Sequence, residues 1–577
     1  MKGGRFLLPA LFKTLLLPPL IAALFTHHFP SLSLSFTALI YLLSFPALYV
    51  FRSYTSLVAS SWKASALGAI DIPRVRGTWP LNIDVLLNWA KSGTADEVGR
   101  MMVLMARQYG GTYNTRVLGE DQIISSDPRV IKHVLIDDFD NFVKGQKFKE
   151  RAQDFLGDGI FNSDGDNWKF HRSFMRPFFH PTYISPLHLA TSVQNFFTRL
   201  PSYGEAFDIQ ARIGQLALEL AMMWLCGEDM SAGASNVART EEWKRAKGQI
   251  SWAMTEAQKI VGKRVKIGTV WPLFELTHDP LERPMKVIRA FFRPIISEAL
   301  NRKRQRCKLD NTEDVYMIDR LVEATDDIKL VEDQLINVLL ASRDTLASLL
   351  TFSAYAIVLH PDIAARLKDE VFTVANQESE VTKDTVRQLR YCRAFINEVL
   401  RLFPPIPLNI RRTLRPSLLP TPNHLVYMPA NTSIILATIL MQRDPAVWGE
   451  DAQVFNPDRW LEGGLGKERE GFVSWNLGPR MCLGQSLALT ITHTFLVYFF
   501  RHIAHVGTLV GQNITTQLAP DAQPPETALP KEWMTLEGGD GRARGGRDRV
   551  WIVADVVLAV KGGLWIRFGA EGTEETS

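Results

Sequence analysis

The chain has 577 residues, of which 46% are hydrophobic and 22% are charged. A chain with this many apolar residues can bury a hydrophobic core large enough to offset the conformational entropy that is lost on folding. The composition therefore excludes a disordered protein. The 65 basic and 61 acidic side chains leave a net charge of +4, too small for a protein that binds nucleic acid by neutralising phosphates. Four cysteines are too few for a disulfide framework, and they favour a reducing compartment.

Two apolar segments open the chain. Residues 32–51 are uncharged, and a helix of this length spans about 30 Å, the thickness of the hydrocarbon layer. They predict a transmembrane helix, with a buried core helix as the alternative. Residues 7–25 are also apolar, apart from Lys13. Three interpretations are open for them: a second membrane crossing, one arm of a re-entrant hairpin, or a signal peptide. Basic residues flank both segments, so the positive-inside rule places the rest of the chain in the cytosol with either one crossing or two.

The remainder of the chain is mainly helical by its hydrophobic periodicity, and its few extended runs are short. No glycine-rich nucleotide loop is present, which argues against a doubly wound α/β fold. The pattern predicts a mainly α fold with small, local antiparallel β-sheets. Helical spacing recurs over residues 98–109, 209–226, 284–306, 333–359, 362–375, 385–403 and 486–503, and extended runs occur at 122–126, 433–436, 553–559 and 564–568.

One cysteine has an unusual local sequence. Cys482 lies between a Gly478-Pro479 turn and Gly484, immediately before a helical run. Backbone N–H groups and the helix dipole would stabilise a thiolate there, and glycine lets a flat cofactor approach the backbone closely. Arg480 could bind an anionic group such as a haem propionate. The spacing fits an axial thiolate ligand of haem iron, with a buried, inert cysteine as the alternative.

The stretch WNLGPRMCLG at residues 475–484 resembles the cysteine loop F-x-x-G-x-R-x-C-x-G of the cytochromes P-450, the haem-thiolate monooxygenases. It matches that loop at Gly478, Arg480, Cys482 and Gly484, while Trp475 replaces the phenylalanine. The resemblance implies the cytochrome P-450 fold, with haem b bound through Cys482 as the axial ligand of its iron.

Two further motifs resemble the charge cluster of this family. Glu398 and Arg401 match its E-x-x-R, and the i, i+3 spacing places both side chains on one helix face, where they can pair. Arg459, in the stretch FNPDRW at residues 455–460, matches the arginine that completes the cluster. An E-x-x-R pair taken alone is often a solvated surface pair, but here it precedes the cysteine loop in the expected order.

Trp168 and Arg172 resemble the W-x-x-x-R of the helix that binds haem propionates. Their i, i+4 spacing puts an indole N–H and a guanidinium, both hydrogen-bond donors, on one face. The alternative is a tryptophan–arginine stack at the surface.

The stretch ASRDTL at residues 341–346 resembles (A/G)-G-x-(D/E)-T-(T/S) in the long helix that crosses the haem. The resemblance implies that Asp344 gates protons and that Thr345 hydrogen-bonds dioxygen. The alternative is local back-bonding within the helix and a solvated carboxylate. Two residues depart from the pattern. Ser342 replaces a glycine, which would reduce the helix distortion that makes room for dioxygen, and Leu346 replaces a hydroxyl, which makes the pocket less polar.

The resemblance covers residues 70–510 and 559–568, whereas residues 511–552 fit nothing in the family. This segment contains a basic, glycine-rich run at residues 538–549, which favours a flexible loop. Contact with acidic lipid or RNA, and translated intron sequence, are the alternatives. We therefore expect an anchor over residues 1–55, a linker over 56–80, a haem-binding domain over 81–510, a low-complexity insertion over 511–552, and a terminal β-hairpin and tail over 553–577.

The resemblance implies a membrane-bound monooxygenase of the endoplasmic reticulum that inserts one oxygen atom from O2 into an apolar substrate. Electrons would come from NADPH through NADPH-cytochrome P-450 reductase, with cytochrome b5 as a second donor. Residues 145–177 look like fungal members of the alkane and fatty-acid hydroxylase branch, which implies long-chain aliphatic compounds. Terpenoids, polycyclic aromatics and stilbenes remain alternative substrate classes. The reaction would serve secondary metabolism or detoxification.

Two other functions remain open at this point. An isomerase or dehydratase of the same fold would need no proton relay, so Asp344 and Thr345 argue against it. A degenerate, non-catalytic haem protein is supported only by the departures at Trp475, Ser342 and Leu346.

Overall fold

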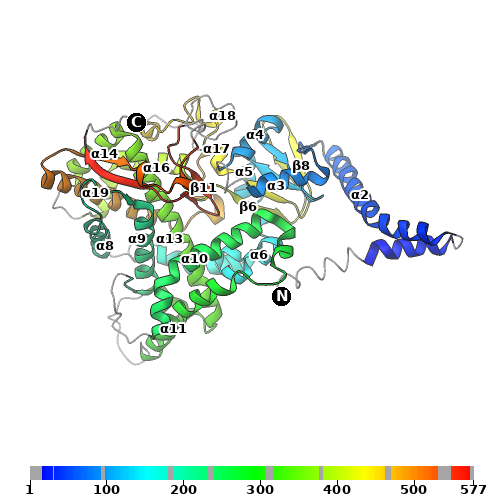
Figure 1. Cartoon of the computed structure of the whole chain (residues 1–577), viewed down its shortest axis with the longest axis horizontal. Helices are drawn as coiled ribbons and strands as arrows, with labels where there is room; N and C mark the ends of the chain where they lie inside the picture. Colours follow the sequence, from blue (N-terminus) through cyan, green and yellow to red (C-terminus); the bar gives the residue numbers. More distant parts are fainter. Residues whose placement is uncertain are drawn as a thin grey trace.

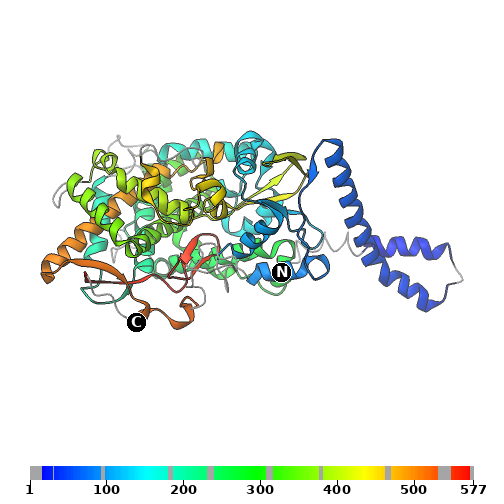
Figure 2. The same ribbon diagram turned by 90° about the horizontal axis from the view of Figure 1, so that it is seen from above.

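A helical arm built from the N-terminal part of the chain projects from a wedge-shaped body (Figures 1 and 2). The structure is a computed structural model. It describes residues 16–29, 32–91, 98–179, 186–230, 240–306, 316–375, 381–461, 470–530 and 547–571.

The body is built around one long helix, α13 (Ile328–Leu359). Asp327 begins it by accepting hydrogen bonds from the backbone amides of Lys329 and Leu330. Most of its later residues are apolar and buried, and α9 (Ile209–Cys226) packs along it. The other helices of the body are α3 (Ile83–Lys91), α4 (Arg100–Tyr109), α5 (Pro128–Lys132), α6 (Gln146–Leu156), α7 (Gly165–Met175), α8 (Pro186–Thr198), α10 (Glu241–Ile267), α11 (Glu282–Arg306), α12 (Met317–Ala324), α14 (Pro361–Val374), α15 (Lys383–Gln388), α16 (Arg390–Leu402), α17 (Thr438–Met441), α18 (Pro445–Trp448) and α19 (Gln485–Val510).

Each helical stretch expected from periodicity contains a helix, with two differences. The expected helix over residues 385–403 is divided into α15 and α16, because Leu389 has a non-helical backbone (φ −74°, ψ 71°). The long helix α10 was not predicted, since its many charged residues interrupt the apolar pattern.

The strands form four small sheets, and here the prediction of local, antiparallel pairing is partly wrong. The pairs β3–β9 and β1–β8 are parallel, and both join segments far apart in the chain. The sheets have the orders β2-β3-β9-β6-β4, β1-β8-β7, β10-β13-β5 and β11-β12. The strands are β1 (Ile70–Asp71), β2 (Thr112–Asn114), β3 (Gln122–Ser125), β4 (Phe142–Val143), β5 (Phe207–Asp208), β6 (Asn409–Thr413), β7 (Ser417–Pro420), β8 (Leu425–Met428), β9 (Ser433–Leu436), β10 (Ile514–Leu518), β11 (Ile552–Ala554), β12 (Leu558–Val560) and β13 (Trp565–Ala570).

Helix α13 contributes to two hydrophobic cores. Its N-terminal half, with Leu335 and Leu339, packs into a core shared with α10 and α11. Its C-terminal half, with Leu349 and Phe352, packs into a core shared with α16 and α19. The middle of α13 therefore lies where the two cores meet, and the cavity described below opens there.

The segment expected as an insertion is in part folded. Strand β10 lies within residues 511–552 and pairs with β13 over five residues, so the start of this segment belongs to a sheet of the body. The glycine-rich run lies outside the described residues, apart from its last three positions.

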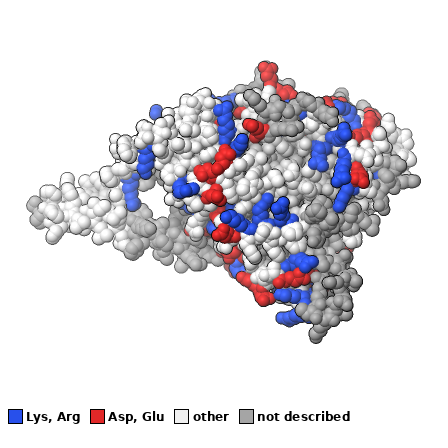
Figure 3. Space-filling model, turned by 180° about the vertical axis from the view of Figure 1, so that it is seen from behind, with Lys and Arg blue, Asp and Glu red and all other residues white. Residues whose placement is uncertain are grey.

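The arm contains the short helix Leu16–His27 and the 33-residue helix α2 (Leu34–Ala66). The most apolar 18-residue stretch of α2 has no buried residue. Helices α13 and α19 are also long and apolar enough to cross a membrane, but 67% of the corresponding stretch of each is buried in the body. Figure 3 shows almost only uncharged side chains along the arm, with Lys and Arg toward its base. Helix α2 continues through residues 56–66, which were expected to belong to a linker.

The C-terminal half of α2 is fixed to the body. The Ser61 hydroxyl donates to the Asp71 carboxylate of β1, and Ala64 is buried. The Arg116 guanidinium donates to the backbone oxygen of Ser53 at 3.3 Å. The arm thus meets the body through a packed junction.

Candidate functional site

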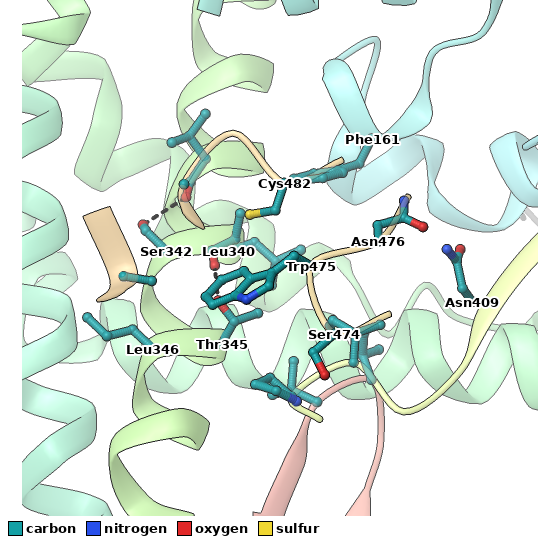
Figure 4. Close-up of a pocket in the computed structure, with 18 of the residues that line it drawn as sticks. Phe161, Leu340, Ser342, Thr345, Leu346, Asn409, Ser474, Trp475, Asn476 and Cys482 are labelled. Carbon is teal, nitrogen blue, oxygen red and sulfur yellow. Dashed lines mark hydrogen bonds between the residues drawn. The ribbon is translucent and has the colours of Figure 1, made fainter. Parts of the chain in front are cut away.

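A cavity of about 950 Å³ lies beside the middle of α13. Its walls are mostly apolar and come from α7, α9, α10, α13, the start of α19 and the loop at residues 473–484. Figure 4 shows Cys482 on this loop, and Ser342, Thr345 and Leu346 on α13, around the same cavity. Trp475 also lines it. A large, mostly apolar space with a small share of polar groups is typical of a small-molecule site.

The loop before Cys482 is held by backbone geometry that its sequence makes possible. Gly478 has φ +64°, and a Cβ atom there would lie 2.3 Å from the Leu135 carbonyl oxygen, so a larger residue is excluded. The Cys482 amide donates to the Trp475 carbonyl at 2.8 Å. Gly484 lies at the N-cap of α19, and a Cβ atom there would make only ordinary contacts, the nearest at 3.6 Å. The loop thus presents Cys482 at a helix N-terminus, as the sequence predicts.

The Cys482 thiol is free and exposed to the cavity. Enclosure by the protein raises its pKa, because the thiolate loses hydration there. The backbone amides of Gly484 and Gln485 and the positive charge of Arg172 act in the opposite direction. These groups favour the thiolate over the thiol. A metal cation bound to the sulfur would lower the pKa of Cys482 further and keep it deprotonated.

Four basic side chains line the cavity near the loop: Lys144, Arg172, Arg411 and Arg480. One acid, Asp164, accepts from Arg480 at 2.9 Å and from the Lys144 backbone amide at 2.9 Å. Burial lowers the pKa of Lys144 well below its usual range, and the nearby charges of Arg411 and Arg480 add to this effect. The cluster therefore holds a surplus of positive charge.

This surplus fits an anionic cofactor. Arg411 is buried, and its Nε–H has no hydrogen-bond partner. A buried donor left unpaired is costly, and an acceptor bound in the cavity would remove that cost. The two carboxylates of haem b suit the cluster, while Cys482 suits its iron. Residues that would hold haem are thus Cys482, Arg480, Arg411, Lys144 and Arg172.

Trp168 and Arg172 both come from α7, as expected. The Trp168 ring is buried, with the Arg480 guanidinium carbon 4.5 Å and the Arg172 carbon 5.8 Å from its centroid. The indole therefore supports the cation cluster by stacking. Lys144 and Arg411 were missed by sequence reasoning, because they follow β4 and lie in β6 without any motif of their own.

On α13, Thr345 and Ser342 line the cavity, but their hydroxyls bond to their own helix. Thr345 donates to the Ala341 carbonyl, and Ser342 donates to Val338 at 2.8 Å. This is the back-bonding that the sequence left open. Leu346 also lines the cavity, and α13 continues through this region as one α-helix.

Asp344 is not among the residues that line the cavity. It accepts from the Arg343 Nε at 2.5 Å, while Arg343 also donates to Ser251 and Thr255 of α10. The second carboxylate oxygen of Asp344 is buried without a hydrogen-bond partner. Burial raises the pKa of Asp344, although the Arg343 charge opposes the effect. The acid is therefore next to the cavity wall but held toward α10.

At the centre of the charge cluster behind the cavity, Glu398 and Arg401 are fully buried. The Glu398 carboxylate accepts two bonds from Arg401, at 2.7 and 2.8 Å, and one from Arg459 at 3.1 Å. Trp460 and the backbone of Asn456 donate to it as well, each at 2.9 Å. The cluster joins α16 to the segment at residues 442–460 and supports the cavity wall without reaching into it.

The comparisons with known proteins agree with this site. The family model for Cytochrome P450 matches residues 78–506. The chain is 29% identical to Cytochrome P450 52E1 of Candida apicola over 83% of this chain and 93% of that one. It is 29% identical to Cytochrome P450 52A13 of Debaryomyces hansenii, over 66% and 75% of the two chains. It is also 29% identical to Cytochrome P450 monooxygenase himC of Aspergillus japonicus, over 68% and 70%.

A helical body with a cysteine loop, a cation cluster and an apolar cavity defines a haem-thiolate protein. The chain belongs to the cytochrome P450 family. It is a monooxygenase of that family, with thiolate-ligated haem as its cofactor and NADPH as its electron source through a partner reductase.

Proposed function

We propose that this chain is a membrane-anchored monooxygenase that hydroxylates long-chain aliphatic substrates. The observation that carries the proposal is the joint position of Cys482, the basic cluster and the apolar cavity. Haem bound there supplies the activation of O2 that no amino-acid side chain can provide. Cys482 would ligate the iron, and Lys144, Arg411 and Arg480 would hold the propionates.

The residues of α13 would serve proton delivery. Thr345 faces the cavity, and its hydroxyl can turn from the Ala341 carbonyl to an oxygen atom in the site. Asp344 lies beside it with one oxygen unpaired and a raised pKa, which suits a group that takes up and releases protons. Rotation of Asp344 away from Arg343 would bring a proton toward the cavity wall.

The cavity supports an apolar substrate. Its lining is mostly aliphatic and aromatic, and about 950 Å³ is enough for a long chain next to the haem. The resemblance of residues 145–177 to alkane and fatty-acid hydroxylases favours a long chain over terpenoids or polycyclic compounds. Helix α2 would bring the cavity close to a membrane in which such compounds dissolve. We propose the endoplasmic reticulum, with the body facing the cytosol and NADPH-cytochrome P-450 reductase as partner.

Two measurements test this function. The reduced, carbon-monoxide-bound protein should give the long-wavelength band of a thiolate ligand, and Cys482→Ser should abolish it. A spectral titration of the purified protein with fatty acids, polyaromatics and terpenoids would then show which class perturbs the haem. An unchanged band in Cys482→Ser, or a response to terpenoids alone, would contradict the assignment of ligand or of substrate.

The back-bonded hydroxyl of Thr345 and the displaced Asp344 are the observations that favour a second candidate, an isomerase or dehydratase that needs no proton relay. Consumption of NADPH in the presence of reductase and substrate separates the two. A monooxygenase oxidises NADPH and forms a hydroxylated product, whereas an isomerase turns over without NADPH.

A further inference from the structure

The charged residues that line the cavity fall into two groups. Lys144, Arg172, Arg411 and Arg480 form the cluster assigned to the cofactor. The remaining two, Lys266 and Asp555, pair with each other at 3.4 Å. The side chain of Lys266 is 22% exposed and that of Asp555 is 43% exposed, so this pair marks a place where the cavity reaches solvent.

This opening lies between α10 and the β11–β12 hairpin. A Cβ atom at Gly262 would lie 3.2 Å from the Asp555 carbonyl oxygen, so helix and hairpin are in close contact there. Lys266 follows one turn later on the same helix face. Its ammonium donates to the Ala554 carbonyl at 3.0 Å and reaches the Asp555 carboxylate.

The Lys266 ammonium has one donor left. It carries three N–H groups, and two of them are used by Ala554 and Asp555. The side chain of Asp555 is half-exposed and can rotate toward the solvent. That rotation would release a second N–H group of Lys266. The neighbouring lining residues Val261, Val265, Val556 and Val557 are apolar and suit a hydrocarbon chain.

We propose that Lys266 binds the carboxylate of a long-chain fatty acid whose chain extends into the cavity, an inference that rests on the proposed function. A carboxylate at this opening would lose part of its hydration to the neighbouring apolar side chains, and a charged partner would offset that cost. The basic cluster near Cys482 is assigned to the cofactor, which leaves Lys266 as the lysine or arginine available for this role among the described lining residues. The acid would displace Asp555, so the two carboxylates compete for one ammonium.

The test is a spin-state titration of the full-length holoprotein in detergent with hexadecanoic acid, 1-hexadecanol and hexadecane. The variants are Lys266→Met, which keeps the length of the side chain, Lys266→Arg, which keeps its charge, and Asp555→Asn, which weakens the competitor. Lys263→Met is the matched control, because Lys263 lies on the exposed face of the same helix and is absent from the lining.

Loss of the Lys266 charge should weaken binding of the acid about 10- to 100-fold, the range for a hydrogen bond to a charged group. Binding of the alcohol and the alkane should stay within about twofold, because neither carries a charge. Lys266→Arg should retain most of the affinity for the acid, Asp555→Asn should raise it, and Lys263→Met should change nothing.

Two results would overturn the inference by itself. In the first, Lys266→Met weakens acid, alcohol and alkane equally, which would mean that Lys266 only shapes the opening. In the second, Lys266→Met leaves the affinity for the acid unchanged. A parent protein that responds to none of the three long-chain probes would instead refute the proposed function, and the inference with it.

Discussion

Removal of Arg401 should strongly destabilise the protein, because it leaves the Glu398 carboxylate buried without its main partner. Both side chains have 0% exposure, and Arg401 supplies two of the hydrogen bonds that Glu398 accepts. Arg401 also donates to the carbonyls of Gln442, Ala452 and Val454, which would lose a donor. Breaking such a buried pair costs about 3–5 kcal/mol, a large part of a typical stability of about 5–15 kcal/mol.

The assay is urea unfolding of Arg401→Ala in detergent, followed by tryptophan fluorescence, together with the haem content of the purified protein. Arg366→Ala is the matched control, since Arg366 makes a two-bond pair with Asp458 in which both side chains are 51% exposed. Exposed pairs contribute up to about 1 kcal/mol, so this control should stay close to the parent.

A double variant tests the cause of the loss. Glu398→Leu combined with Arg401→Leu removes both charges, so it should cost less than the sum of the two single changes. If Arg401→Ala unfolds at the same urea concentration as Arg366→Ala and binds haem normally, the argument from the buried pair is wrong.

Three further outcomes follow from the site. Thr345→Ala should bind haem normally, yet form less product and more hydrogen peroxide per NADPH oxidised. Thr345→Ser should restore the yield of product per NADPH. An unchanged yield in Thr345→Ala would contradict the role of Thr345 in proton delivery. Gly478→Ala should lower haem content and the thiolate band, because its Cβ atom would meet the Leu135 carbonyl; a normal yield of holoprotein would show that the loop can shift. Burial raises the pKa of Asp164, but bonds from the amides of Lys144 and Gly145 and the charge of Arg480 outweigh this and lower it. Asp164 therefore adds stability above its unfolded pKa that is lost as the pH falls through its lower folded pKa. Asp164→Asn should flatten that loss in unfolding measurements that extend below the ordinary aspartate pKa of about 3.9.

Most of the residues that sequence reasoning found have a role that depends on local spacing, whereas Arg459, which reaches Glu398 from a distant segment, was found through the family resemblance. Glu398 and Arg401 pair because they are three residues apart on α16, and the turn at Gly478 brings Cys482 to the N-terminus of α19. Such relations lie within one element, so they can be read from the chain itself.

What could not be predicted depends on segments that meet only in the folded body. Arg411 and Lys144 reach the same cavity from β6 and from the segment after β4, and neither belongs to a motif. Asp344 follows the expected pattern, but its direction depends on Arg343, which binds α10. The parallel pair β3–β9 likewise joins strands far apart in the chain, so no local alternation could reveal it.

In the proposed membrane-anchored state, the length of α2 sets the distance between the body and the membrane. Its 33 residues extend about 50 Å, whereas the hydrocarbon layer takes up about 30 Å. The remaining turns would then emerge as a stalk that is held to the body at its start, where Ser53 accepts from Arg116, and nearer its end, where Ser61 donates to Asp71. A stalk of this kind fixes the height and tilt of the body, which a flexible tether would leave free. A soluble version of the protein should therefore begin near Arg52, where the uncharged run of α2 ends, because a cut after Ala66 would also remove the surface that covers Tyr427.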